Sequence, residues 1–172
     1  MNWYETLDIG LQGEMEVIIN LPGDIPGVQF VPTFNPVMAM WNKNGAIGGG
    51  HNVDLRADDR INRTFRFYDI KTKTEFLRIK DGTGIDKSAY DYYIKSCIFH
   101  DYPFGLIFVL LEPGKKKATQ IVGGMIHPQE EDYIDSRGIK WPGYSNDGSM
   151  IQFSLERMKP LSEIWNWGYI NR

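Results

Sequence analysis

The sequence predicts a mainly β domain of the α+β class, a β-sandwich or half-barrel with one flanking helix. Three observations support this prediction. Short segments alternate apolar and polar residues, Gly and Pro punctuate those segments throughout, and one other segment has a clear helical period. With 172 residues and 42% hydrophobic side chains, the chain can bury one core. We therefore expect a single domain over residues 1–172, with long loops at about 42–60 and 127–149.

The first half of the chain predicts strands separated by a long excursion. Residues 15–21 are rich in β-branched side chains and stop at a Pro-Gly pair, which favours a buried strand. Prolines surround residues 28–33, so that segment is expected to be an edge strand or extended loop. Residues 37–41 fit a short strand, and the Gly-rich stretch 42–60 fits a loop. Residues 63–69 alternate with period two, which predicts a half-buried strand.

The second half predicts a helix, a hairpin and a last strand. Residues 86–99 place apolar side chains on one helical face behind Asp86, a plausible N-cap. Residues 106–112 and 118–126 flank a short Pro-Gly-Lys turn, the pattern of a β-hairpin. Residues 150–158 alternate again and predict a strand that ends before Pro160.

Composition restricts the function classes. A formal charge of −3 and a pI near 5.6 lack the cationic excess of proteins that wrap nucleic acid, so we expect no sequence-specific nucleic-acid partner. Cys97 is the only cysteine, which favours folding inside a cell. The first ten residues lack the pattern of a secretory signal. No apolar run approaches the roughly 20 residues of a membrane helix, so we expect no membrane partner.

Two candidate sites involve histidine, and both have a simpler explanation. Cys97 and His100 have the spacing of half a zinc site or of a nucleophile and its base. A structural zinc needs four ligands, so a buried thiol beside a surface histidine is the simpler interpretation. Residues 48–51, Gly-Gly-Gly-His, could bind an anion through their backbone amides. A phosphate site of this kind needs a helix that begins directly after the glycines and usually a following Lys with Ser or Thr, and neither follows here.

Charged runs are the next candidates. Asp58-Asp59 and the acids at 130–132 could bind a hard cation, yet they lack the spacing of a calcium loop and are expected to face water. Lysines 115–117 at the hairpin turn could contact phosphate or an acidic partner, although such runs often only maintain solubility. We therefore predict no metal, no cofactor and no catalytic residue.

Aromatic residues are the remaining candidates for contact with a partner. Trp and Tyr side chains are enriched at protein interfaces and also stack on sugars, while core packing is the alternative. The interface candidates are Tyr133, Trp141, Tyr144, Trp165 and Trp167.

The order of these elements resembles the tail tube proteins of contractile-tailed bacteriophages. The likeness rests on the strand ending at residues 21–23, the strand at 63–67, the following helix, the hairpin ending at 122–128 and the alternating segment 151–155. The resemblance implies a non-enzymatic structural protein of the virion, assembled in the host cytoplasm. Its partners would be copies of itself, in a hexameric ring in that family, and other virion proteins.

Three functions therefore stand as alternatives. The first is a virion protein that assembles into rings, at the tube, its end, the neck or the baseplate. The second is a monomeric β-sandwich that binds a glycan or another ligand through Trp and Tyr. The third is a small enzyme using Cys97 and His100. For the first, residues 127–149 should form an arm onto a neighbouring chain, because they join two strands by a long path without alternation.

Overall fold

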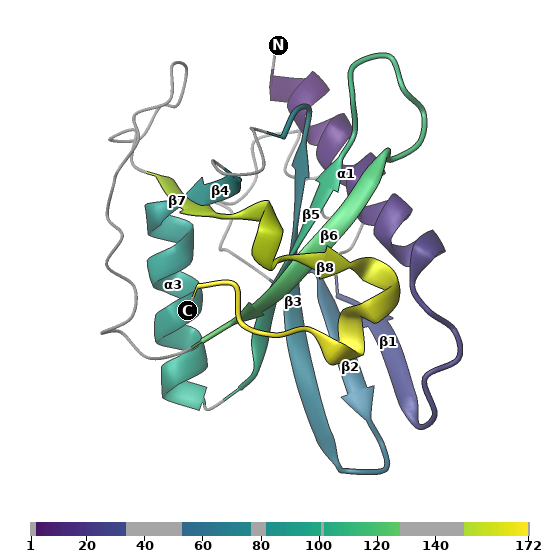
Figure 1. The fold of residues 1–172 in the computed structure, drawn as a ribbon, viewed down its shortest axis with the longest axis vertical. Coiled ribbons are helices and arrows are strands. Elements are labelled where there is room, and N and C mark those ends of the chain that lie inside the picture. Colours follow the sequence, from purple (N-terminus) through teal and green to yellow (C-terminus); the bar gives the residue numbers. More distant parts are fainter. Residues whose placement is uncertain (1–2, 34–52, 77–81, 101, 128–149, 172) are drawn as a thin grey trace.

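The computed structural model describes residues 3–33, 53–76, 82–100, 102–127 and 150–171, and these form a mixed β-sheet covered on both faces (Figure 1). The sheet has six strands in the order β1-β2-β3-β5-β6-β8. Their bounds are Val28–Pro32 (β1), Leu55–Asp59 (β2), Thr64–Lys73 (β3), Phe104–Leu110 (β5), Gln120–Ile126 (β6) and Lys159–Pro160 (β8). A smaller sheet pairs β4 (Thr83–Asp86) with β7 (Met150–Phe153).

The strands change direction once in a way that needs a crossover. β1, β2 and β3 form an antiparallel meander, but β3 and β5 are parallel neighbours. A parallel pair cannot be joined by a tight turn, and here β4 and the helix α3 (Lys87–His100) make the connection. β6 and β8 then continue antiparallel to β5 and β6, respectively.

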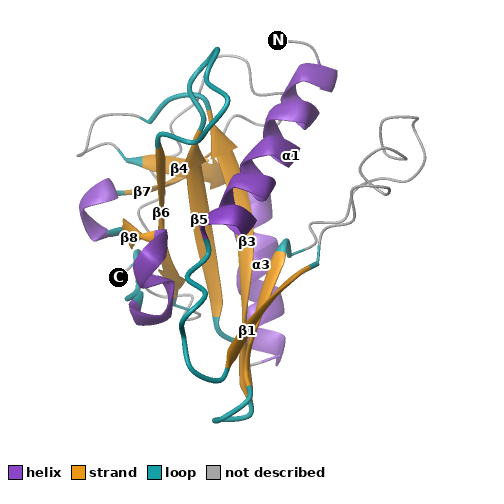
Figure 2. Cartoon of the chain, turned by 90° about the vertical axis from the view of Figure 1, so that its right-hand side faces the viewer, coloured by secondary structure: helices purple, strands orange, loops and turns teal. Residues whose placement is uncertain are grey.

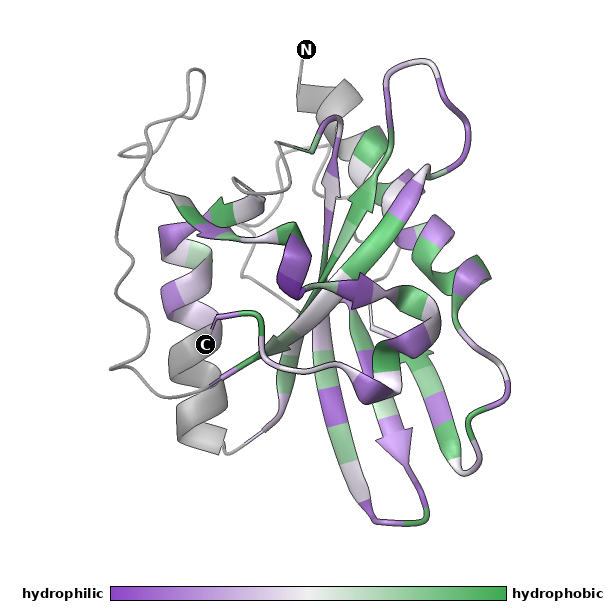
Figure 3. Cartoon of the chain, viewed as in Figure 1, coloured by the Kyte–Doolittle hydropathy of each residue, from purple (hydrophilic) through white to green (hydrophobic). Residues whose placement is uncertain are grey.

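Helices cover opposite faces of the large sheet, as Figure 2 shows for α1 (Trp3–Asn20) and α3. On one face, Tyr90 and Tyr93 of α3 pack with β4, β7 and the central strand β5. On the other, Val17 of α1 and the 3₁₀ helix η3 (Leu161–Asn166) pack against Tyr68 and its neighbours. β5 is buried from both sides, and Figure 3 shows it mainly in the hydrophobic colour. None of the described helices is long and apolar enough to cross a membrane.

The mainly β, α+β class is confirmed, as are the edge strand β1, the helix α3 and the hairpin β5-β6. The second β layer consists of only two described strands, and two α-helices flank the large sheet where one was expected. Residues 37–41 and 128–149, with the predicted strand and most of the predicted arm, lie outside the described residues.

The prediction of a strand at residues 15–21 is wrong, because α1 continues to Asn20. The β-branched residues suggested a strand, but Gly13 and Val17, four residues apart, are the buried positions and define a helical face. A Cβ on Gly13 would lie 1.9 Å from Thr72 Oγ1, so this glycine lets α1 approach β3 closely. Tertiary packing therefore outweighs the local preference for a strand.

Two further boundaries needed correction. The predicted loop at 42–60 contains β2, whose residues alternate between buried and half-buried; the two adjacent acids at its end concealed this alternation. The predicted strand at 150–158 stops at Phe153, because the Ser154 hydroxyl accepts a hydrogen bond from Glu156 N and begins the 3₁₀ helix η2 (Leu155–Arg157). Pro160 does not follow the last strand but belongs to β8.

Candidate functional site

A cluster of buried charged side chains lies where β2 begins beside the longer strand β3. The register pairs Leu55 with Tyr68, so β3 continues past the start of β2. Asp54 occupies this position. Its backbone N–H donates to Tyr68 O at 3.0 Å, and its carboxyl Oδ2 accepts the Ile70 N–H at 2.7 Å. The Asp54 carboxylate thus accepts the hydrogen bond that a backbone carbonyl of a neighbouring strand would otherwise accept from Ile70 N–H.

Asp69 and Lys71 of β3 lie beside Asp54, on the face of the sheet that α3 covers. Alternation along β3 places Phe67, Asp69 and Lys71 on one face and Tyr68 and Ile70 on the other. Asp69 is 1% exposed, and Lys71 Nζ lies 2.7 Å from its Oδ2. The Asp54 side chain lies close enough to Asp69 for the charge of Asp69 to raise its pKa.

Burial and mutual repulsion change the ionisation of these acids. Burial, followed by the charge of Asp69, raises the pKa of Asp54 to about 8, although the Ile70 N–H opposes the shift. Burial and Asp69 also raise the pKa of Glu14 to about 7, against the attraction of Lys71. Glu14 belongs to α1, beside the close contact of Gly13 with Thr72. Three acids from α1, the start of β2 and β3 therefore influence one another.

The basic and phenolic groups of the cluster are shifted as well. Burial lowers the pKa of Lys71, but the three acids outweigh burial and the net pKa is raised. For Lys73 only Asp86 opposes the effect of burial. Burial and the neighbouring charge of Lys71 therefore lower the pKa of Lys73 to about 8. Burial, then the charge of Asp69 and a hydrogen bond with it, raise the pKa of Tyr93 of α3. At neutral pH Lys71 is a fixed ammonium and Tyr93 a hydrogen-bond donor.

Further lysines surround this end of the sheet. Leu111 N donates to Lys73 O at 2.8 Å, so the β5-β6 turn leaves from the same end. Gln12 Nε2 of α1 donates to Lys116 O at 2.7 Å, which holds that turn against the helix that carries Glu14. The exposed lysines 115–117 therefore lie at the same end of the sheet as Lys71 and Lys73, with acids among them: Glu16 Oε2 accepts the Ala118 N–H at 2.9 Å, and Glu75 and Glu112 lie nearby in the sequence.

The cluster has the composition of a site for a hard cation. Mg²⁺ prefers oxygen ligands and is commonly held by one or two carboxylates, with water and substrate phosphate completing the shell. Asp54 and Asp69 are such a pair, and Glu14 lies near enough to affect their charge. Within the described residues no group of three His, Cys, Asp or Glu side chains is arranged to hold a metal ion. What remains is a pair of carboxylates, one of which, Asp69, is 1% exposed and already paired with Lys71.

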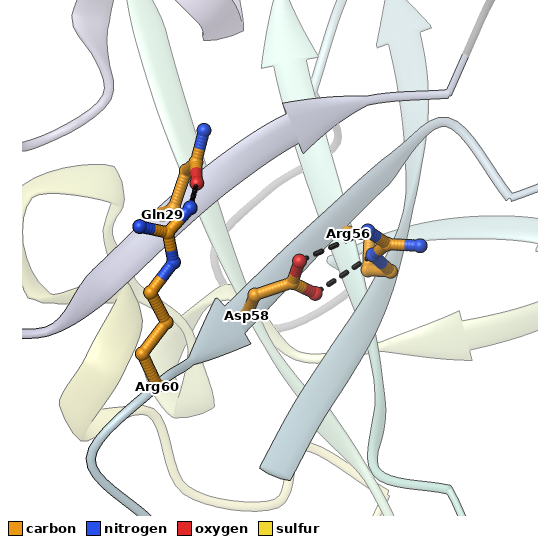
Figure 4. Close-up of polar contacts among 4 residues, drawn as sticks. All are labelled: Gln29, Arg56, Asp58 and Arg60. Atoms are coloured by element: carbon orange, nitrogen blue, oxygen red, sulfur yellow. Dashed lines mark hydrogen bonds and ion pairs between the residues drawn. The ribbon is translucent and has the colours of Figure 1, made fainter. Parts of the chain in front are cut away.

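A second polar feature lies on β1 and β2 (Figure 4). Arg56 forms a two-point ion pair with Asp58, with Nε–Oδ1 at 2.7 Å and Nη2–Oδ2 at 2.9 Å. Arg60 at the end of β2 donates to the side-chain oxygen of Gln29 on β1. Beside Arg56 and Asp58 there is an open depression of about 330 Å³.

The candidates predicted from sequence separate into several groups. Asp58 pairs with Arg56, and Asp59 accepts the backbone N–H groups of Ile61 and Asn62, so these acids stabilise β2 and its turn. The acids at 130–132 and residues 48–51 lie outside the described residues. Cys97 and His100 fall in the last turns of α3, where only the backbone is described.

Of the aromatic candidates, Tyr133, Trp141 and Tyr144 lie outside the described residues. Trp167 is 6% exposed and donates from Nε1 to Pro160 O at 3.0 Å. Trp165 is half-buried, with the Arg66 guanidinium 3.8 Å from its ring centroid.

Sequence reasoning missed Glu14, Asp54, Asp69 and Lys71. The available signal was Asp69-Ile70-Lys71, which places two charges at alternate positions of a strand that continues into the interior. No protein-family model, curated protein or solved structure matches the chain. The function must therefore be inferred from the site itself.

Proposed function

We propose that the protein is a divalent-cation-dependent phosphodiesterase that cleaves nucleic acid at the Asp54–Asp69–Lys71 cluster. The observation that carries this proposal is the pairing of two neighbouring carboxyl groups with a lysine: Asp54 accepts the Ile70 N–H on β3, Asp69 is 1% exposed, and Lys71 Nζ lies 2.7 Å from Asp69 Oδ2. Strongly shifted pKa values from burial and specific charge partners are concentrated at functional sites.

A purely structural role explains this arrangement poorly. Burying two carboxyl groups side by side is unfavourable even when one of them holds a proton, and apolar residues of similar size commonly stabilise a fold as well or better. Ile70 N–H needs one acceptor, which a neutral Asn would provide equally well. A bound cation accounts for both acids, since it makes their charged forms favourable.

The groups present fit hydrolysis at phosphorus. A cation held by Asp54 and Asp69 supplies a Lewis acid that polarises a phosphate oxygen and promotes ionisation of water. Lys71, whose pKa is raised, remains charged at neutral pH, so its role is to stabilise negative charge on the phosphate and not to accept a proton. Water adds to phosphorus and gives up a proton to solvent, the ester P–O bond breaks, and the leaving alkoxide takes up a proton from solvent.

The substrate class follows from the surrounding charge. The chain carries a net charge of −3, yet Lys71, Lys73 and lysines 115–117 gather at this end of the sheet. Lysine ammonium groups at this end of the sheet could contact the phosphates of a polyanion, although Glu16, Glu75 and Glu112 lie among them. Nucleic acid is the polyanion whose linkages are phosphodiesters.

A cleavage assay tests the proposal. End-labelled DNA and RNA are incubated with the protein in Mg²⁺ or EDTA, together with Asp69→Asn and the control Glu163→Gln, which alters an exposed acid of η3 paired with Lys159. We expect cleavage in Mg²⁺ only, a loss of roughly 10²- to 10³-fold for Asp69→Asn, and near-normal activity for the control. No Mg²⁺-dependent cleavage of either polymer, or equal rates for wild type and Asp69→Asn, would refute it.

The virion protein inferred from the sequence remains a prediction. It differs from the proposal in two measurable ways, since it requires ring assembly in solution and no cleavage. Light scattering of the purified chain, combined with the assay above, distinguishes the two.

A further inference from the structure

An aromatic cluster lies on the same face of the sheet as the carboxyl pair, toward the other end of β3. The rings of Phe65 and Phe67 are 5.3 Å apart between centroids, and Tyr102 lies 4.6 Å from Phe65 and 5.6 Å from Phe67. Tyr102 is 38% exposed, and both phenylalanines are half-buried. These rings are thus partly open to solvent, although Phe67 also packs against the core beneath α3.

Arginines border the same rings. The open depression of about 330 Å³ is lined by Arg56, Arg63, Phe65 and Phe67, with Asp58, Asp59 and Thr64. Asp58 holds the Arg56 guanidinium at two points, and Asp59 is occupied by the turn after β2. Arg63, in that turn, is exposed and has φ 54°. The depression therefore combines two aromatic side chains with one arginine held by Asp58 and one exposed arginine.

The register makes this surface continuous with the proposed cleavage site. On β3, Phe65, Phe67 and Asp69 occupy alternate positions of one face. On β2, Asp58 lies opposite Phe65 and Arg56 opposite Phe67, and Asp54 follows at the next alternate position. Phe65 and Asp69 are separated by four residues, about 13 Å along the strand. We call this surface, formed by Arg56, Arg63, Phe65, Phe67 and Tyr102, the aromatic-arginine track.

We propose that the aromatic-arginine track binds unpaired nucleotides of the strand that is cleaved at Asp54 and Asp69. This inference rests on the proposed function and specifies its substrate. Aromatic faces stack on bases only where those bases are not already stacked within a duplex, and arginines beside them bind the backbone phosphates. Two acids offset the arginines of the depression, so stacking contributes more to affinity than net charge does.

Fluorescence anisotropy with labelled oligothymidylate tests the track in EDTA, where no cleavage occurs. The variants are Tyr102→Ala and Phe65→Leu, the second of which retains an apolar side chain if the first disturbs the fold. The matched control is Tyr169→Ala, a tyrosine 49% exposed that bridges to β6, away from β2 and β3. A blunt duplex of equal length serves as the competitor.

We expect the oligothymidylate to bind more tightly than the duplex, and Tyr102→Ala to weaken binding by at least about fivefold. Phe65→Leu should weaken it to a smaller extent, and Tyr169→Ala should not change it. Equal binding of duplex and single strand, or an unchanged affinity in both track variants, would overturn the inference. If the track variants bind normally but Mg²⁺-dependent cleavage is seen, the proposed function holds and only the track is wrong. If the track variants lose binding but no cleavage is seen, the track is a binding surface and the proposed function is wrong.

Discussion

Replacing Asp54 with Asn should stabilise the protein at alkaline pH, even though Asp54 belongs to the proposed site. Asn has nearly the same shape as a protonated Asp, and its amide oxygen can still accept the Ile70 N–H. The variant therefore keeps the local hydrogen bond and removes only the charge that repels Asp69 and Glu14. Lys71 and Tyr93 also face this charge, and neither is altered.

The expected magnitude follows from the pKa of Asp54, which rises from 3.8 to about 8 on folding. Between these values the folded state holds a proton that the unfolded state has lost, so stability falls as pH increases. One pKa unit corresponds to about 1.4 kcal/mol. From pH 5 to pH 8 the upper limit is thus about 4 kcal/mol, and partial exposure and coupling among the acids reduce it to roughly 2 to 3. For a chain of this size that loss lowers Tm by about 4 to 12 °C.

Thermal unfolding in EDTA from pH 5 to pH 8.5 measures this effect. The advantage of Asp54→Asn over wild type should increase by roughly 2 to 3 kcal/mol across the range, and Asp58→Asn should show no such trend. At pH 8, Mg²⁺ should raise the Tm of wild type and not that of Asp54→Asn. A variant that is less stable than wild type by the same amount at every pH would refute the reasoning about this carboxyl.

Three further outcomes are expected. Gly13→Ala should destabilise the protein by about 1 to 3 kcal/mol in urea unfolding, because its Cβ would lie 1.9 Å from Thr72 Oγ1; Gly10→Ala, with nothing within 4 Å, should be neutral or slightly stabilising. Phe153→Ala should cost roughly 3 to 5 kcal/mol and Gln152→Ala far less, and equal costs would mean that β7 faces another way. At limiting Mg²⁺ the cleavage rate should rise from pH 6 to pH 8.5, since the cation must displace the proton of Asp54; a flat profile would contradict this.

The pattern of apolar, polar and proline residues along the sequence correctly predicted those elements whose structure depends mainly on residues close to them in the chain. The apolar period of α3 matches the burial of its described side chains, and two β-prone runs around a short turn predicted the β5-β6 hairpin. The prolines around β1 favoured its position at the edge of the sheet. α1 was mistaken for a strand at its C-terminal end, because one of the buried positions on its inner face is Gly13, which packs closely against Thr72 of β3. A glycine gives no apolar signal, so the helical period was not visible.

The candidate site was beyond local pattern for a different reason. Asp54 and Asp69 are brought together by the pairing of Leu55 with Tyr68, a register that no spacing in the sequence reveals. Glu14 arrives from a helix that packs against β3, far along the chain. Asp58-Asp59, which the sequence singled out, are instead bound to their own strand and turn.

Proton release on Mg²⁺ binding tests the central claim most directly. Isothermal titration calorimetry at pH 7 in two buffers of different ionisation enthalpy gives both the binding and the number of protons released. Asp54 and Glu14, with pKa values of about 8 and about 7, are largely and partly protonated at this pH. Wild type should therefore bind Mg²⁺ and release about one proton per ion, whereas Asp69→Asn should bind far more weakly. Absence of binding at millimolar Mg²⁺, or binding that releases no proton and is unchanged in Asp69→Asn, would contradict the assignment of the carboxyl pair as a cation site.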